Sequence, residues 1–322
     1  MASAFDIVMD SRKELVEKIL NMMEEGYVLT APEWNKQALR PYNPISAVTY
    51  KGGNRLKLMV AAIKQEYKDP RWMTVRQMKM AGYQKKPGDE GILCEKWIFE
   101  KKIKQLNEEG IEETVIERIE PPRVSFFVVY NAEQVVDFPA LKFQTVENKR
   151  TMEILDNLMK TSECPIIEAA QANAYYEYQM DRIVLPPRNF FKDDISFAKT
   201  SIHEMAHSTG HKTRLNRDMN HPFGSPEYAR EELRAEIGAL FLENDLGLRL
   251  EAEHYQDHSN YLASWIKVLK DDPNELFRAC SDAEKISQRL MGNYRARYPV
   301  PDMETIQIKE QTIPPRQAER SR

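Results

Sequence analysis

The segment that most constrains this chain lies at residues 200–211, which read TSIHEMAHSTGH. His203 and His207 are four residues apart, so on a helix their imidazoles project from one face, one turn apart, at the spacing that a single zinc ion requires. Glu204 would then lie beside the open coordination position, where a carboxylate can take a proton from a polarised water molecule. The motif predicts a helix that ends near Gly210 and carries two metal ligands and a general base.

The third ligand of such a site is not expected in the segment directly after the motif. An extended version of the motif, HExxHxxGxxH, requires a histidine where this chain has Thr213, so that class of metallopeptidase is excluded. His211 lies four residues beyond His207, but Gly210 is expected to end the helix before it. Alone, the motif also fits an amphipathic helix on which this spacing arose by chance. The third ligand therefore decides between the two interpretations.

A later, glutamate-rich segment offers the third ligand. Residues 226–244 have apolar side chains at helical spacing and contain three candidate glutamates, Glu231, Glu232 and Glu236. Glu232 and Glu236 share one helix face, which suits a ligand followed one turn later by a carboxylate that orients a histidine ring. We therefore predict that Glu232 binds the metal and that Glu236 supports a histidine. The competing interpretation of these acids is a solvated helix face.

Other polar residues have roles that the sequence leaves open. His221, Tyr228 and Arg214 are candidates for donating a hydrogen bond to an oxyanion opposite the metal. His254 and His258 repeat the four-residue spacing, but they lack the glutamate of the motif and are expected at the surface.

The charge of the chain is unevenly distributed. The formal net charge of the 322 residues is only -4, yet residues 34–104 contain 16 lysines and arginines against 6 acids. This stretch has a local charge near +10, so the remainder carries about -14. The N-terminus lacks the apolar core of a signal peptide, and no apolar run approaches the length of a membrane span. The three cysteines form no CxxC pair, so we expect buried thiols, a cytoplasmic location and no membrane partner.

The periodicity of the chain predicts an α+β protein with two modules and a tail. A basic α+β module is expected at residues 1–145, a mostly helical module with a short β-hairpin at 146–297, and a loose tail at 298–322. Helices are predicted at 10–25, 148–160, 195–209, 226–244, 251–270 and 273–291, with two more after the glycine pair at 52–53 and between Thr74 and Gly82. A strand is predicted at 92–99, followed by an acidic hairpin excursion and a strand around FFVVYN.

Several segments together resemble one protein family. The segments are YKGGNRLKL, RWMTVRQMKMAGYQKKPGDEG, DRIVLPPRNFF, SIHEMAHSTGHKTRLNRD and YAREELRAEIGALFL. In order and spacing they resemble the ArdC-type antirestriction proteins of plasmids and other mobile elements, over roughly residues 10–295. The resemblance implies an N-terminal domain that binds single-stranded DNA and a C-terminal zincin-like metallopeptidase domain. The chain departs from the family pattern in its paired glycines, in the helix segment MVAAI and in the acidic segment 106–120.

The basic module is compatible with single-stranded DNA as a partner, because lysines and arginines can follow phosphates while aromatic rings stack on bases. For Trp72 and Trp97, however, a place in the core is the favoured interpretation. The predicted DNA contacts are Tyr50, Lys51, Asn54, Arg55, Arg76, Lys85 and Lys86.

Three functions fit these features. The first is a DNA-binding antirestriction protein with a metal-dependent peptidase domain, holding one divalent ion, zinc or manganese. The second is an active metallopeptidase whose N-terminal module only recruits a protein or peptide substrate. The third is a DNA-protection protein whose metal site is not catalytic. The presence of Glu204 argues against the third, because a structural zinc site has no need of a general base.

Overall fold

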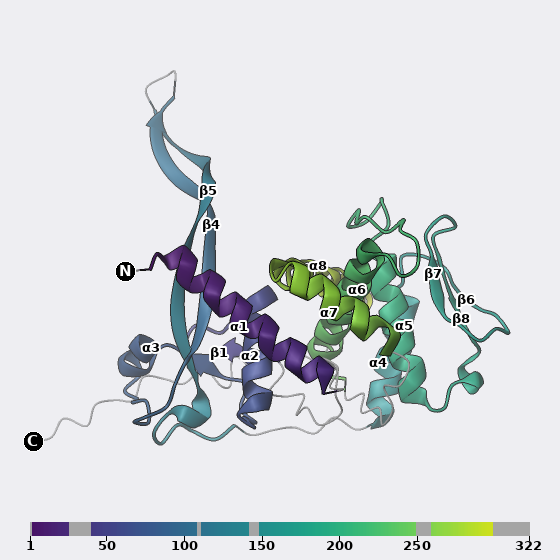
Figure 1. Ribbon diagram of the computed structural model, residues 1–322, viewed down its shortest axis with the longest axis horizontal. Coiled ribbons are helices and arrows are strands. Elements are labelled where there is room, and N and C mark those ends of the chain that lie inside the picture. The colour runs from purple at the N-terminus through teal and green to yellow at the C-terminus, as the bar shows by residue number, and fades with distance from the viewer. Residues whose placement is uncertain (1, 26–39, 108–110, 142–147, 249–258, 299–322) are drawn as a thin grey trace, which may run out of the picture.

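A computed structural model describes residues 2–25, 40–107, 111–141, 148–248 and 259–298, and it has the predicted α+β class (Figure 1). The helices are α1 (Ala4–Glu24), α2 (Gly52–Lys64), α3 (Val75–Met80), α4 (Asn148–Lys160), α5 (Asp194–Ser208), α6 (Pro226–Asp245), α7 (Ser259–Asp271) and α8 (Asn274–Arg297). The strands are β1 (Tyr42–Asn43), β2 (Val48–Thr49), β3 (Trp72–Met73), β4 (Ile92–Leu106), β5 (Glu112–Asn131), β6 (Ile166–Glu168), β7 (Tyr175–Glu177) and β8 (Arg182–Leu185). None of the helices in these ranges is long and apolar enough to cross a membrane.

Most of the predicted helices are confirmed, with shifts at their ends. α1 begins six residues before the predicted start because Ser3 and Asp6 form a capping box there. Thr74 caps α3 as predicted, and its hydroxyl accepts a hydrogen bond from the Gln77 backbone. The predicted helix at 251–270 is described only from Ser259 onward. His254, His258 and the tail beyond Tyr298 lie outside the described residues.

A long two-stranded ribbon projects from the N-terminal module (Figure 1). β3, β5 and β4 form an antiparallel sheet in which only β4 and β5 continue outward. The strand predicted at 92–99 runs on to Leu106, and the predicted acidic hairpin excursion is confirmed, because the segment after Leu106 turns back and forms the first half of β5. Acidic and basic side chains face each other across the strands, as in the ion pair of Lys101 with Glu117 at 2.9 Å. The acidic segment therefore neutralises part of the basic charge seen in the sequence.

The C-terminal module packs helices against a small mixed sheet. β8 is the central strand, parallel to β6 and antiparallel to the edge strand β7. The short β-hairpin predicted for this module is β7–β8, with Asp181 in the left-handed region (φ 46°) at its turn. A core of buried side chains from α4, α5, α6, α8 and β8 lies beneath the hairpin.

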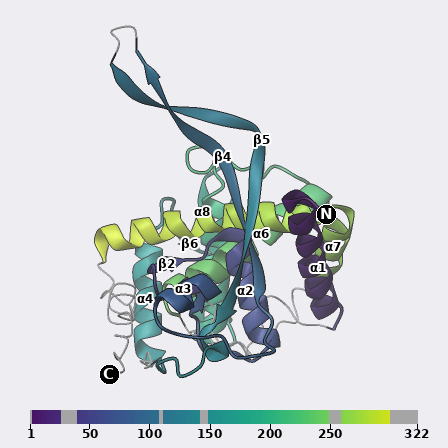
Figure 2. The ribbon, with the colours of Figure 1, turned by 90° about the vertical axis from the view of Figure 1, so that its left-hand side faces the viewer.

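The two modules share a hydrophobic core. Side chains of α1 and α2 pack with those of α6, α7 and α8 in one buried cluster, in which Leu56, Phe241 and Leu276 are fully buried. Figure 2 shows α1 beside α7, and α2 packs against α8. The contact is close at Gly53, where an added Cβ would lie 2.4 Å from the Phe277 ring. The junction is therefore built like a core rather than like a flexible linker.

Arg55 adds a buried ion pair to this junction. Its side chain is 3% exposed and extends from α2 to α6, where one guanidinium nitrogen lies 2.9 Å from Asp245 and donates to the Phe241 carbonyl at 3.0 Å. The guanidinium also lies over the Phe241 ring, 4.1 Å from its centroid. A buried charge must be paired, so the position of α2 on α6 depends on this contact.

We expect Arg55→Ala to lower the free energy of unfolding by about 3 kcal/mol, because it leaves the Asp245 carboxylate less compensated in a buried place. Urea unfolding followed by circular dichroism measures the change. Lys64→Ala, at an exposed position of the same helix, is the control and should change the value by less than about 0.5 kcal/mol. A loss below 1 kcal/mol in Arg55→Ala would show that the pair does not hold the junction.

Candidate metal centre

Local sequence explains why α5 presents the HExxH residues to the interior. Asp193 caps the helix by accepting the Ser196 backbone N–H at 2.7 Å, and Ile202 and Met205 anchor its apolar side in the core. The helix ends at Ser208, two residues before Gly210. Gly210 has a steric role, because an added Cβ would lie 2.0 Å from the Met219 sulfur.

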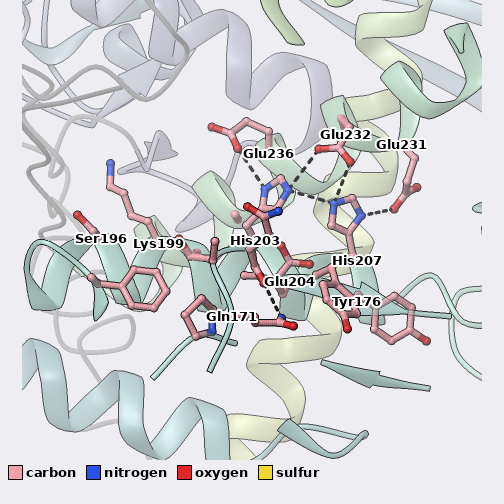
Figure 3. Close-up of a pocket in the computed structure, with 18 of the residues that line it drawn as sticks. Gln171, Tyr176, Ser196, Lys199, His203, Glu204, His207, Glu231, Glu232 and Glu236 are labelled. Atoms are coloured by element: carbon pink, nitrogen blue, oxygen red, sulfur yellow. Dashed lines mark hydrogen bonds and ion pairs between the residues drawn. The ribbon is translucent and has the colours of Figure 1, made fainter. Parts of the chain in front are cut away.

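The structure brings His203, His207 and Glu232 together. The two Nε2 atoms are 3.0 Å apart. One Glu232 oxygen lies 3.4 Å from Nε2 of His203, and the other lies 3.4 Å from Nε2 of His207. One donor atom from each of the three residues lies within 4.8 Å of the other two (Figure 3).

Further carboxylates face the outer nitrogens of both rings (Figure 3). Nδ1 of His203 is 3.3 Å from Glu236, the residue predicted for this place. Nδ1 of His207 is 3.1 Å from Glu231, which in turn accepts a hydrogen bond from Arg217 at 2.7 Å. Such contacts leave each Nε2 to serve as the inward-facing ligand atom. Sequence reasoning placed Glu231 only among the candidate ligands and missed Arg217, which follows α5 in a loop without regular spacing.

The electrostatics of this cluster fit a cation. Burial alone lowers the pKa of His207, but the carboxylates of Glu232 and Glu231 outweigh it and raise that pKa to about 9. Burial likewise opposes a charge on His203, yet Glu232 and Glu236 hold its pKa well above the usual value. Buried carboxylates thus surround the two imidazoles and favour positive charge between them. The donor set of two imidazoles and one carboxylate is that of a catalytic zinc site, so these residues fit one divalent metal ion.

Glu204 lies beside the three converging residues, in the wall of a cavity of about 1100 Å³. Its side chain is 7% exposed, and burial raises its pKa, although His207 and His203 partly oppose the increase. The edge strand β7 lines the same cavity through Tyr175 and Tyr176. An enclosed carboxylate with a raised pKa is suited to exchange protons with a water molecule or a leaving group.

Of the three candidate oxyanion donors, the structure brings only Tyr228 into the cavity wall. Arg214 instead binds Asp181 and the hydroxyl of Tyr176, and so fastens the β7–β8 hairpin to the end of α5. His221 lies 3.0 Å from Asp218, and neither it nor Arg214 lines the cavity.

His211 also lies away from the three converging residues. Its Nδ1 is 2.8 Å from the Thr213 hydroxyl, and its ring packs on Tyr178.

Three of the predicted DNA contacts are committed to protein partners. Asn54 forms two hydrogen bonds with the Glu95 backbone, at 2.8 and 2.9 Å, and Arg55 is buried in the junction. The Tyr50 hydroxyl donates to the carbonyl of Trp72, which is fully buried in the core. The polar groups of these three side chains are therefore bonded within the protein.

The other predicted DNA contacts lie nearer the surface. Lys51 and Arg76 are exposed. The Lys85 ammonium donates to the carbonyls of Lys86 and Asp89, both at 2.8 Å, and that of Lys86 donates to the Glu133 carbonyl at 2.8 Å.

The contact between Glu231 and His207 predicts an effect on metal affinity. Glu231→Gln removes the charge that orients and polarises the ring, so we expect the affinity for Zn²⁺ to fall about 10- to 100-fold. Titration against a fluorescent chelator measures it. Glu227→Gln, an exposed change in the first turn of the same helix, should leave the affinity unaltered. Equal affinities in wild type and Glu231→Gln would refute the supporting role.

Comparisons with known proteins identify relatives of both modules. Residues 9–130 match the N-terminal domain of the anti-restriction factor ArdC, and residues 153–282 match a zincin-like metallopeptidase family. Two crystal structures of the antirestriction protein ArdC from plasmid R388 are 28% identical and cover 88% of this chain. The metal-free structure has a TM-score of 0.67 and is covered over 98% of its length, and the Mn(II)-bound one has 0.69 and 97%.

Curated relatives extend the likeness. Two DNA primases TraC of Escherichia coli are 36% and 34% identical, over 86% and 93% of this chain, but the chain spans only 19% and 28% of their lengths. Protein y4eC of Sinorhizobium fredii is 30% identical over 86% of this chain and 90% of its own length. With both domains matched in order and the fold shared along most of the chain, this protein belongs to the ArdC-type antirestriction family.

Proposed function

We propose that this protein combines single-stranded DNA binding by its N-terminal module with metal-dependent peptide hydrolysis by its zincin-like module. The observation that carries the proposal is the convergence of His203, His207 and Glu232 beside the buried Glu204 in one large cavity. A purely structural site would have no use for that fourth group or for open space beside it.

In the proposed reaction, His203, His207 and Glu232 hold one divalent ion, zinc or manganese. When bound, the ion would act as a Lewis acid that polarises a peptide carbonyl and a water molecule. Glu204 would take the proton from a water molecule whose oxygen attacks the carbonyl carbon, and would pass it to the amine that departs as the carbon–nitrogen bond breaks. Tyr228, in the cavity wall, is the proposed donor to the developing oxyanion. Glu236 and Glu231 keep the two imidazoles in the orientation in which Nε2 faces inward.

The DNA part of the proposal rests on charge and on the relatives. Residues 34–104 have an excess of about ten positive charges, and Lys51 and Arg76 are exposed there. The primases and antirestriction proteins that resemble this chain are named for processes that involve DNA. We infer binding through phosphates, which is tolerant of sequence and weakens with salt. Three buried free cysteines suit a reducing compartment, and we place this activity in the cytoplasm.

Metal content tests the site directly. We expect about one divalent ion per chain in wild-type protein purified without chelators, measured by plasma mass spectrometry. Glu232→Ala should lose most of it, because two imidazoles alone hold the ion weakly. Glu204→Gln should retain the metal but hydrolyse peptides about 100- to 10,000-fold more slowly, because it cannot accept a proton. Wild-type protein that takes up no metal even after reconstitution would leave DNA binding as the main activity.

The same Glu204→Gln variant distinguishes the three candidate functions. If the protein protects single-stranded DNA by binding alone, this variant should slow nuclease digestion of the DNA as much as wild type does. The two proteins are compared at the same fraction of bound DNA. If the variant no longer protects the DNA, protection depends on peptide hydrolysis, and the two activities are coupled. If wild type hydrolyses peptides but does not bind DNA, the second candidate function is supported, in which the N-terminal module only recruits a protein or peptide substrate.

A further inference from the structure

Exposed aromatic side chains gather in one part of the N-terminal module. Among the described residues of this module, three aromatic side chains are classed as exposed, namely Phe5 at 51%, Phe99 at 54% and Phe126 at 40%. Phe5 lies at the start of α1, Phe99 on β4 and Phe126 on β5. All three surround the half-buried Trp97 of β4, and we call these four residues the aromatic cluster. A cluster of exposed rings, unlike a single one, marks a binding surface.

The rings of the cluster lie on one face of the ribbon. Trp97 and Phe99 are two residues apart on β4, with their centroids 6.5 Å apart and their planes inclined by only 25°. Phe5 meets the Trp97 ring edge-on, with a centroid separation of 6.4 Å. Phe126 is paired with Glu95 in the register of the ribbon, so its side chain lies on the same face as Trp97, one pair further along.

The first turns of α1 hold the inner part of the cluster against the ribbon (Figure 1). Arg12 forms two hydrogen bonds with the carboxylate of Glu95, at 2.9 and 2.5 Å. Its guanidinium also lies 5.2 Å from the centroid of the Trp97 ring. The position of Trp97 is therefore explained by contacts within the protein.

The position of Phe99 is not explained by packing in the core. Phe99 belongs to none of the buried clusters of the described residues. It lies at a break in the register between Ile98 and Glu100, where residues 119–122 of β5 are opposite Phe99 alone. A break of this kind redirects the side chain beside it. Here it presents a ring, stacked on Trp97, at the surface of the ribbon.

The charge beside the cluster favours an anionic ligand. We define the base of the ribbon as residues 92–99 and 123–131, which contain one acid, Glu95, and two basic residues, Lys96 and Arg123. The acid is neutralised by its ion pair with the arginine of α1. Lys96 and Arg123 are exposed, and neither has an ion-pair partner in the part of the chain that the structure describes. The base of the ribbon thus carries two positive charges that the fold does not offset.

This charge is confined to the base of the ribbon. Beyond the register break, at 100–106 and 112–122, four basic residues face five acidic ones. The positive charge and the exposed rings therefore occupy the same part of the ribbon. Aromatic faces with neighbouring cations are the combination that binds single-stranded DNA, because bases stack on rings while phosphates attract the cations.

The shape of the ribbon favours a nucleic acid over a protein partner. A stable protein interface buries roughly 800 Å² on each partner. A ribbon of two strands about 4.8 Å apart offers little of such an area. Because the ribbon is so narrow, the long side chains of Lys96 and Arg123, which leave its opposite face, can reach a phosphate around its edges.

We propose that the base of the ribbon binds single-stranded DNA, with bases stacked on Phe99 and Phe126 and phosphates held by Lys96 and Arg123. The proposal rests on the proposed DNA-binding function and assigns its base contacts to the ribbon. Stacking of this kind accepts any base, because every base has an aromatic face.

The test compares two substitutions of one exposed ring. Phe99→Leu keeps an apolar side chain but removes the aromatic face, whereas Phe99→Trp keeps a face on which a base can stack. Fluorescence anisotropy with a labelled oligothymidylate measures the affinity of each protein. Phe99→Leu should bind about 5- to 50-fold more weakly than wild type, and Phe99→Trp should bind as tightly as wild type. Ile116→Ala, at an exposed apolar position of the outer ribbon, is the control and should also match wild type.

An abasic oligomer of the same length separates stacking from charge, because it keeps the phosphates but has no bases. Phe99→Leu should bind this oligomer as tightly as wild type does, whereas Arg123→Gln should bind both oligomers more weakly. If Phe99→Leu weakens binding of both oligomers equally, the ring does not stack on a base and the proposal is wrong.

Two further outcomes separate the ribbon from the proposed DNA-binding function. If wild type binds the oligothymidylate and every variant binds it equally well, the ribbon site is overturned while the DNA-binding function stands, and the cluster is then left for a protein partner. If wild type binds neither oligomer, the DNA-binding function itself is contradicted, together with the ribbon site.

Discussion

The pairing of α5 with α6 through buried histidine–carboxylate contacts is the constraint on which the C-terminal module depends. Glu231, Glu232 and Glu236 are each less than 10% exposed, and all lie against the two imidazoles. Unpaired carboxylates at that depth would destabilise the fold, so α6 has to present them to α5. The opposite face of α6 contributes Leu233 and Phe241 to the core shared with the N-terminal module. One helix therefore carries a metal ligand and its supporting carboxylates on one face and contributes to the junction with the N-terminal module on the other.

This arrangement explains which parts of the candidate site could be predicted from sequence. His203 and His207 are set by helical periodicity, and the one-turn spacing of Glu232 and Glu236 likewise follows from the helix. Helical periodicity does not predict a role for Arg217, because its contact with Glu231 depends on how the loop after α5 folds back. Periodicity also cannot show whether Glu231 faces the metal or contacts a histidine ring, because that depends on how α6 is rotated about its axis relative to α5.

The fold shows the same division between local and long-range information. The α+β class and most helix positions follow from capping residues and periodicity, and the structure confirms them. The length of β5 could not be predicted, because the acidic segment 106–120 is polar on both faces and lacks the alternation that marks a strand. What makes it a strand is its partner, β4, whose lysines pair with its glutamates across the ribbon. Such pairing depends on register, which a single strand does not reveal.

Charge counted along the sequence also differs from charge available for binding. Part of the positive charge of residues 34–104 is offset by glutamates of β5 in the ribbon. The charge of Arg55 is offset by its ion pair with Asp245 at the junction. Lys85 and Lys86 donate to backbone carbonyls. Asp245, the partner of Arg55, is the last residue of α6, the helix that also carries Glu232. The module junction and the metal centre therefore share one structural support, because Arg55 and the two imidazoles all lie against carboxylates of the same helix.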